Sequence, residues 1–372
     1  MSFPIVALGD AVTFLDHLRK PITTKDRVSG PVPYYGANGQ QDSVAGYIFD
    51  EPLVLLAEDG GFFQQPNKGV AYRICGPSWV NNHAHVLRPR ENVDIGYLRR
   101  VLENYRLAPF VSGSTRGKLT KENALLIPIP LPHLSEQRRI AAILDHADEL
   151  RTKRRRALAL LDELMISSFV DRFGDVTSNS HGFELSDFGD LGQLDRGVSR
   201  ARPRNSAELL GGIHPLIQTG DVANSDGYVR MYSQTYSELG LAQSKMWPAG
   251  TLAITIAANI AKTGILTFAA CFPDSLVGFT PDPMKTNVEF IRFWLSFLQP
   301  TLEAQAPASA QRNINLAILR ALPVPVPTLS AQEDFAKFVR KAQSVKESAE
   351  AHISKLDELF ACLQHRAFNG EL

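Results

Sequence analysis

Two long segments of the chain repeat hydrophobic residues at alternating steps of four and three, which places them on one face of a helix. No glycine or proline interrupts either stripe, so the pattern predicts two helices of about 35 residues, each about 50 Å long, that pack on each other. Ser135 is expected to cap the first helix, and Ser330 to mark where the second can begin. The stripes consist of Ile140, Leu144, Ala147, Arg151, Arg154, Leu158, Leu161 and Met165, and of Phe335, Val339, Ala342, Lys346, Ala349, Ile353, Leu356, Phe360 and Leu363.

The remaining segments are dense in Val, Ile, Tyr, Thr and Phe between Gly, Pro, Asn and Asp, which is typical of β-strands. Examples are "GYIFDEPLVLLAEDGG", "GVAYRIC" and "TLAITIA". Polar residues and a glycine interrupt the most apolar stretch, 251–272, so it predicts two strands about a turn and not a membrane span. Two buried helices are expected among the strands, at 94–105 and 290–298.

Much of the sequence occurs twice. "IPIPLPHLSEQ" at 127–137 returns as "LPVPVPTLSAQ" at 322–332, an offset of 195 residues. Upstream, "FPIVALGD" at 3–10 corresponds to "FELSDFGD" at 183–190 with an offset of 180, so the second copy is about fifteen residues longer in its middle. The chain is therefore a tandem duplication with an α+β fold. Its expected parts are β-rich modules at 1–132 and 183–327 and long helices at 133–177 and 328–366.

The proline-alternating stretch at the end of each module is expected to be a stiff exit into the helix. Proline fixes φ, lacks an N–H donor and disfavours helix in the residue before it. The simpler alternative is that these prolines only mark a domain boundary.

Basic residues interrupt the helical stripes. Arg151 and Lys346 occupy equivalent positions in the duplication, and we expect both side chains to extend outward at the edge of the helix pair. The run from Arg151 to Arg156 predicts a solvated helix face, with a docking or phosphate-facing patch as the alternative.

Composition places the chain among globular cytoplasmic proteins. With 372 residues, 44% hydrophobic and 21% charged, two domains are expected. The three cysteines are far apart, which fits a reducing compartment, and no signal peptide is suggested. The net charge of zero gives no sign of nucleic-acid binding, so that role would need local patches.

Motif searches return no assembled catalytic centre. "GSTRGKL" at 113–119 has too few residues between its glycines for a phosphate loop, and "PDPMK" at 281–285 lacks a nuclease's second acidic residue. The sequence contains no Asn-Pro-Pro-aromatic or Asp-Pro-Pro-aromatic tetrapeptide, and it contains no Gly-x-Ser-x-Gly motif. His83 and His85 could bind a metal as a pair, but with no third ligand in view a hydrogen-bonded structural pair is favoured. The sequence argues against an enzyme, and no catalytic or metal-binding residue is expected.

The ordered, duplicated motifs resemble those of the specificity subunit of type I restriction-modification systems. The resemblance covers nearly the whole chain, although the chain is short for that family. It rests on "PYYGANG" (33–39), "LLAEDGG" (55–61), "WVNNHAHVL" (79–87), "GSTRGKLTKENALLIPIPLPHLSEQRRIAAILDHAD" (113–148), "PLIQTGDV" (215–222), "ITIAANIAKTGIL" (254–266) and "SAQRNINLAILRALPVPVP" (309–327).

The resemblance implies two target recognition domains, each reading one half of a split sequence in double-stranded DNA. It also implies an antiparallel coiled coil that docks two modification (methyltransferase) subunits, which the restriction subunits join. S-adenosylmethionine, ATP and magnesium are expected on these partners and no cofactor on this chain. The partner-binding candidates are Arg151, Arg154 and Arg155. Two alternatives stay open: a helical scaffold that bridges proteins without reading DNA, and a self-sufficient methyltransferase or nuclease.

Loops that combine Gly with Asn, Gln, Tyr and Arg suit contacts with base edges and phosphates. For Tyr34 and Tyr35, packing beneath the glycine turn is an equal alternative. Four arginines within 196–204, with few acids nearby, favour DNA contact over a folded interior. The expected DNA-binding residues are Tyr34, Tyr35, Asn38, Gln40, Ser114, Thr115, Arg116 and Lys118 in the first module, and Arg196, Arg200, Arg202, Arg204, Gln218, Thr219, Asn259, Lys262, Gln311, Arg312 and Asn313 in the second.

Overall fold

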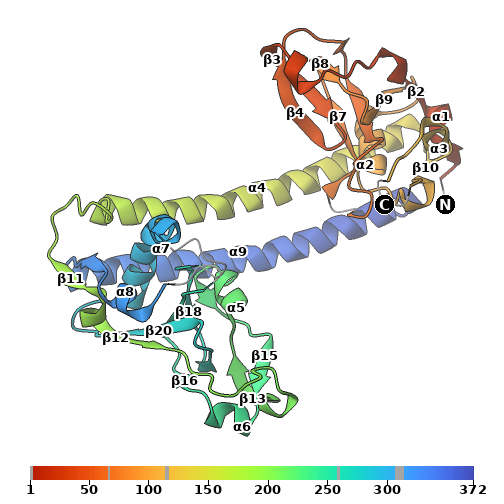
Figure 1. Ribbon diagram of the computed structural model, residues 1–372. Helices are drawn as coiled ribbons and strands as arrows, with labels where there is room; N and C mark the ends of the chain where they lie inside the picture. The colour runs from red at the N-terminus through yellow and green to blue at the C-terminus, as the bar shows by residue number, and fades with distance from the viewer. Residues whose placement is uncertain (1–2, 66–67, 114–116, 258–259, 306–313) are drawn as a thin grey trace. The chain divides into compact units, whose positions relative to one another are not determined.

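The computed structural model describes residues 3–65, 68–113, 117–257, 260–305 and 314–372. The chain forms two compact units. Unit 1 comprises Met1–Arg156 and Ala351–Leu372, and unit 2 comprises Ala157–Glu350. Each unit contains one β-rich module and a portion of each long helix, as the duplication predicts (Figure 1).

The module of unit 1 contains two four-stranded sheets with strand orders β2-β9-β6-β7 and β4-β3-β8-β5. Strand β6 (Leu53–Ala57) is buried along its whole length. Its alternate residues enter two cores, one with Val54 and Leu56 and the other with Leu53 and Leu55, which explains its unbroken apolar sequence. The other elements are α1 (Leu8–Ala11), β2 (Val12–Phe14), β3 (Ser29–Gly36), β4 (Gly39–Val44), β5 (Phe49–Asp50), β7 (Ala71–Ile74), β8 (Pro77–Val80), β9 (Ala84–Pro89), α2 (Ile95–Glu103) and α3 (Lys121–Leu125).

The module of unit 2 repeats this topology. Its sheets have the orders β12-β20-β17-β18-β14 and β15-β13-β19-β16, and the parallel pair β3/β8 returns as β13/β19. The elements are β12 (Gly192–Arg196), β13 (Leu210–Leu216), α5 (Thr219–Ala223), β14 (Tyr228–Val229), β15 (Gln234–Tyr236), α6 (Glu238–Ala242), β16 (Met246–Trp247), β17 (Leu252–Thr255), β18 (Thr263–Leu266), β19 (Ala270–Cys271), β20 (Leu276–Pro281), α7 (Val288–Gln305) and α8 (Leu316–Arg320).

The extra length of the second copy lies in one connection. Strands β3 and β4 are joined by residues 37–38 alone, whereas the equivalent strands β13 and β15 are joined by residues 217–233, which form α5 and β14. The predicted strand pair within 251–272 is confirmed as β17 and β18, and the two predicted helices are confirmed as α2 and α7.

The proline-alternating stretches are short β-strands. β10 (Pro128–Pro130) pairs antiparallel with β1 (Ile5–Ala7), and β21 (Pro323–Pro325) pairs with β11 (Leu185–Asp187). The residue between the prolines, Ile129 or Val324, is fully buried. The repeated motifs at the start and end of each module therefore pair with each other, and this pairing joins the two ends of the module.

The glutamine of each repeated Leu-Ser-x-Gln fastens the module to its helix. The Gln137 side chain is fully buried, accepts a hydrogen bond from the Asp94 N–H and donates to the carbonyls of Asn92 and Pro132. Gln332, also fully buried, accepts from the Asn287 N–H and donates to the Pro327 carbonyl. We call these two side chains the glutamine latches.

The long helices are α4 (Leu134–Phe173) and α9 (Leu329–Asn369). They contain 40 and 41 residues, about 60 Å each at 1.5 Å per residue, so the predicted length of about 35 residues was too short. The predicted cap at Ser135 was also wrong, because both helices begin one residue before the serine. Each ends at a glycine with positive φ, Gly174 at 68° and Gly370 at 73°, where a left-handed residue stops the helix without steric strain.

The two helices run antiparallel within each unit. In unit 1, Arg151 of α4 contacts Asp357 of α9, and Arg139 donates to the carbonyl of Leu372. In unit 2, the rings of Phe169 and Phe335 lie 5.2 Å apart between centroids. Phe169 also packs on four more phenylalanines of α4 and α7, namely Phe173, Phe290, Phe293 and Phe297.

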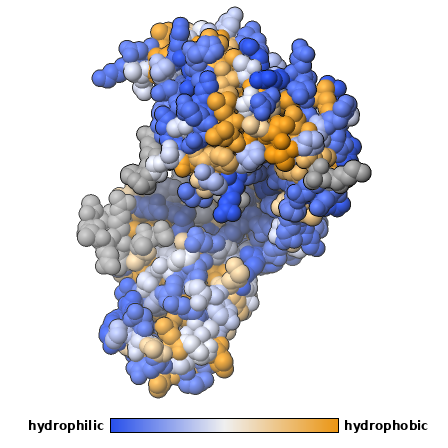
Figure 2. Space-filling view, turned by 90° about the vertical axis from the view of Figure 1, so that its right-hand side faces the viewer, coloured by the Kyte–Doolittle hydropathy of each residue, from blue (hydrophilic) through white to orange (hydrophobic). Residues whose placement is uncertain are grey.

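Hydrophilic residues cover much of the face drawn in Figure 2, with hydrophobic residues gathered in patches between them. Within the described ranges, no helix combines the length and apolarity that a membrane crossing requires.

Candidate functional site

Four of the sequence motifs of the first module meet at one edge of unit 1. The Asn38 side chain, in the turn between β3 and β4, donates to the Gly60 carbonyl at 3.0 Å. Lys118 forms a β-bridge with Asp59, and His83 lies 3.4 Å from the Asp59 carboxylate. We call Asn38, Asp59, Gly60, His83 and Lys118 rim 1.

Rim 1 exposes side chains suited to DNA. Asn38 is exposed, as is Gln40 beside it on β4, and the Lys118 side chain is 53% exposed. The structure thus brings predicted residues from distant motifs onto one surface. Ser114, Thr115 and Arg116, also predicted here, lie outside the described residues.

The two tyrosines of this region do not share that surface. Tyr34 is 1% exposed, and its hydroxyl lies within hydrogen-bonding distance of the backbone of Ile22, so the prediction that it contacts DNA was wrong. The cause is strand alternation, which turns Tyr34 of β3 into the core. Tyr35 is half-buried and packs against Tyr72 with ring centroids 6.0 Å apart.

A charged cluster lies beneath rim 1. His85 is 1% exposed, with Nδ1 2.7 Å from Asp16 and Nε2 2.9 Å from the Leu119 carbonyl. Asp16 and Glu58 place two carboxylates beside this imidazole, within 4.8 Å of one another and of the ring nitrogen. Possible metal ligands that the sequence did not bring into view, Asp16 and Glu58, therefore lie beside His85.

The arrangement nevertheless favours a structural role for His85. Both ring nitrogens already face hydrogen-bond acceptors, and the Arg19 guanidinium occupies the space between the carboxylates and donates to Glu58 and to the Ala84 carbonyl. Burial acts to raise the pKa of Asp16, but its hydrogen bond with His85 and the nearby positive charges outweigh burial and lower that pKa. The cluster holds Leu119 by its carbonyl, and so fixes the backbone that presents Lys118.

Unit 2 builds the same backbone arrangement with different side chains. In unit 1 the Leu119 N–H donates to the backbone carbonyl of Glu58. In unit 2 the Ile314 N–H, 195 residues later, donates to the backbone carbonyl of Ile256. Apolar Ile256 takes the place of the charged Glu58 in this hydrogen bond. Lys262 is exposed, and its N–H donates to Thr255 Oγ1 at 3.0 Å. We call Lys262 and this backbone contact rim 2. Asn259, Gln311, Arg312 and Asn313 lie outside the described residues.

The arginines of 196–204 divide into two groups. Arg202 and Arg204 both pair with Asp274, at 3.7 Å for Arg202. Few acids are near these arginines in the sequence, but the fold brings the distant Asp274 beside them. Arg196 and Arg200 are exposed, and neither side chain has an ion-pair partner among the residues that the structure describes. Gln218 and Thr219 are half-buried at the start of α5, where Gln218 donates to Gln234.

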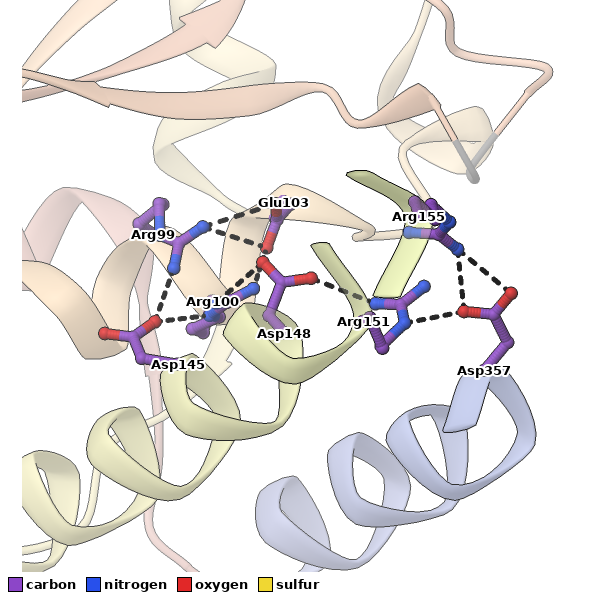
Figure 3. A network of polar contacts seen from close by, with 8 residues as sticks. All are labelled: Arg99, Arg100, Glu103, Asp145, Asp148, Arg151, Arg155 and Asp357. Carbon is purple, nitrogen blue, oxygen red and sulfur yellow. Dashed lines mark hydrogen bonds and ion pairs between the residues drawn. The ribbon is translucent and has the colours of Figure 1, made fainter. Parts of the chain in front are cut away.

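The helix cations are held more tightly than predicted. The Arg151 side chain is 16% exposed and lies 2.6 Å from Asp357, which also accepts from Arg155 (Figure 3). Lys346 is 7% exposed and lies 2.6 Å from both Asp162 and Asp226. The expectation that Arg151 and Lys346 extend outward was wrong, because each finds carboxylates inside its own unit.

Asp162 and Asp357 are themselves related by the 195-residue offset. The two ion pairs are therefore repeats of one pair. Arg154, the third partner-binding candidate, is exposed and forms no ion pair within the described ranges.

Sequence reasoning missed an apolar face on α4. Leu160, Leu164, Ile166 and Val170 are 53%, 49%, 50% and 41% exposed. The signal was present in "LALLDELMISSFV", where leucines stand on both sides of the buried stripe. Helical periodicity places Leu160 and Leu164 on one side of that stripe and Ile166 and Val170 on the other. We call Leu160 and Leu164 the α4 apolar face.

Comparisons with known proteins agree with this organisation. The family model of the type I restriction modification DNA specificity domain matches residues 3–159 and 180–356. A protein of Haemophilus influenzae that carries the name of a type I restriction enzyme specificity subunit is 41% identical over 138 residues, which are 37% of this chain and 35% of that protein. The MjaX specificity subunit of Methanocaldococcus jannaschii is 21% identical over 270 residues, 68% of this chain and 62% of that one.

Solved structures show the same fold at low sequence identity. The S subunit of a type I restriction-modification system from M. genitalium superposes with a TM-score of 0.65 and 14% identity, covering 99% of this chain and 96% of that one. A chain from a structural study of complex assembly and conformational transition in a type I R-M system gives 0.56 and 17%, covering 100% and 98%.

Proposed function

The chain belongs to the type I restriction modification DNA specificity family, and we propose that it is the subunit that reads a bipartite DNA target for such a system. Each module binds one half of the target, and α4 and α9 dock two modification subunits, which the restriction subunits join. The observation that carries this proposal is the backbone arrangement repeated in both units, each with an exposed lysine, Lys118 or Lys262.

The two units differ in the chemistry that they offer DNA. Asn38 of rim 1 and Gln40 beside it are amides, which form paired hydrogen bonds with adenine, whereas Arg196 and Arg200 of unit 2 suit guanine or phosphate. Modules with the same backbone and different side chains would read different half-sites. Lys118 and Lys262 would add phosphate contacts, which strengthen binding without selecting a sequence.

The partner subunits would supply the chemistry. We assign no catalytic step to this chain, and S-adenosylmethionine, ATP and magnesium would bind the modification and restriction subunits. The chain's part is to hold the DNA in register with them.

The α4 apolar face would be one docking surface for a modification subunit. Two large apolar side chains about half exposed one turn apart on the same side of the helix leave area that a partner helix can cover, at roughly 1 kcal/mol or more for each side chain so buried.

Binding of the purified chain to duplex DNA tests the proposal against the alternative of a scaffold that bridges proteins only. A DNA reader, assembled with its modification subunits, should bind duplex with an affinity that falls linearly on a log–log plot as salt increases. Replacing Asn38 and Gln40 with alanine should relax the sequence preference in one half-site only. A complex that assembles normally and shows no salt-dependent DNA binding would support the scaffold.

A further inference from the structure

The glutamine latches dock both modules in the same way. Each glutamine holds the N-terminus of one module helix, α2 in unit 1 and α7 in unit 2, against the start of a long helix. Because the latch residue and its bonds are the same in both copies, they cannot determine which module lies on which helix. A tandem duplication is prone to this kind of misassembly.

Eight residues beyond the latch in unit 1, the long helix carries a negative charge. Asp145 of α4 accepts hydrogen bonds from Arg99 at 2.6 Å and from Arg100 at 2.8 Å, and Asp148 accepts from Arg100 at 3.0 Å (Figure 3). The Arg100 side chain is 3% exposed, whereas Asp145 is 51% exposed. The buried charge therefore belongs to the module, and its partner belongs to the helix.

Eight residues beyond the latch in unit 2, the long helix carries a positive charge. Arg340 of α9, which the 195-residue offset relates to Asp145, donates to Glu289 of α7 at 2.8 Å. The Glu289 side chain is 7% exposed and Arg340 is 48% exposed. The buried charge again belongs to the module, but the polarity of the pair is reversed. Glu289 stands one turn nearer the latch on its helix than Arg100 does.

We propose that these oppositely charged pairs determine which long helix each recognition module docks on. We call the two pairs, Arg100 with Asp145 and Glu289 with Arg340, the key. A first module docked on α9 would bring Arg99 and Arg100 against Arg340, and a second module docked on α4 would bring Glu289 against Asp145. Either error leaves a buried charge facing a like charge, a state that is strongly disfavoured. The correct pairs themselves add little net stability, so discrimination is their main effect.

The consequence for recognition rests on the proposed function. If each module has one permitted helix, the chain fixes which end of the helix pair carries each half-site reader. Arg100, Asp145, Glu289 and Arg340 are then positioning residues for target specificity, although none of them contacts DNA in this account.

Two full-chain variants test the key without DNA. The first exchanges the helix charges with Asp145→Arg and Arg340→Asp, and the second adds Arg99→Gln, Arg100→Glu and Glu289→Arg. The first should melt about 5–15 °C below the native chain, and the second should recover at least half of that loss. An exposed pair serves as the matched control, since Glu149→Lys with Lys153→Glu reverses two side chains 56% and 70% exposed and should leave the melting temperature unchanged.

A chain in which modules 1–132 and 183–327 exchange places gives the functional readout. With its modification subunits, it should methylate the native bipartite target only when the helices also carry Asp145→Arg and Arg340→Asp. The key is refuted if the exchanged chain works equally well on native helices, or if the first point variant melts like the native chain. If the exchanged chains are inactive on both pairs of helices, the melting temperatures of the point variants decide.

The two proposals fail separately. The predicted melting pattern together with an absence of any bipartite methylated sequence would retain the key and reject DNA reading. Bipartite methylation with unchanged melting temperatures would do the reverse.

Discussion

Replacing Lys346 with methionine should destabilise unit 2. The Lys346 ammonium lies 2.6 Å from both Asp162 of α4 and Asp226 of the recognition module, and its side chain is 7% exposed. Methionine keeps most of the packing of the lysine stem and removes the charge. Breaking a fully buried pair costs about 3–5 kcal/mol, but Asp162 and Asp226 are 45% and 56% exposed, and water would screen them. The expected loss in the free energy of unfolding is therefore about 1–3 kcal/mol.

Arg151→Met provides the matched control in unit 1. It removes the equivalent cation, but Asp357 keeps Arg155 at 2.7 Å, so the expected loss is below about 1 kcal/mol. Urea unfolding followed by tryptophan fluorescence measures both, since Trp247 and Trp294 report on unit 2 and Trp79 on unit 1.

The pH dependence of the Lys346→Met effect is a second readout. Burial acts to lower the pKa of Lys346, but its hydrogen bonds with Asp162 and Asp226 outweigh burial and raise it above the usual 10.5. A raised lysine pKa contributes stability that is fully present below the unfolded-state pKa and lost as the pH rises through the folded-state value. The difference between native and variant chains should thus be constant near neutral pH and shrink above about pH 10.5. An unchanged unfolding midpoint, or an equal loss in Arg151→Met, would refute the reasoning.

Three further predictions concern binding and chemistry. Arg196→Ala with Arg200→Ala should weaken DNA binding nearly equally for all sequences and reduce the salt slope by about two, whereas Arg204→Ala, already paired with Asp274, should change it little; a changed methylated sequence would instead mean that these arginines read bases. Leu160→Ala with Leu164→Ala should weaken association with the modification subunit at least tenfold in a titration, with the unfolding midpoint of the free chain nearly unchanged; equal binding would remove the α4 apolar face from the docking surface. The purified chain alone should neither methylate nor cut DNA, and turnover by a preparation free of partner subunits would contradict this.

The duplication made most of the fold predictable. Repeated motifs fixed the two modules and both long helices, and the apolar period located the stripe from Ile140 to Met165. The helix ends were less accurate because a helix continues until a residue stops it, and that residue is a glycine in the left-handed conformation, Gly174 or Gly370. Those glycines are visible in the sequence and could have corrected the lengths.

The errors at the candidate site arose from partners that are distant in sequence. The Lys346 side chain was expected to extend into solvent because its partner Asp226 is far away in the sequence. The pair between Arg204 and Asp274 could not be predicted for the same reason. Tyr34 is different, since two adjacent tyrosines on a strand must face opposite sides and one of them had to enter the core. The hydrophobic pattern predicts which face of a helix or strand is buried. The residues that pack against that face can be identified only from the tertiary structure.

Genome-wide mapping of methylated sites tests the central proposal most directly. In cells carrying the modification subunits, the native chain should give one split sequence with a fixed gap. Inserting Leu-Ala-Leu-Leu into α4 between Arg156 and Leu161 lengthens the helix that joins the modules by about 6 Å, and DNA advances about 3.4 Å per base pair. The variant should therefore keep both half-site sequences and lengthen the gap by one or two base pairs. A gap that stays fixed while the half-sites change, or two half-sites that both respond to substitutions in one module, would contradict two readers held apart by a helical spacer.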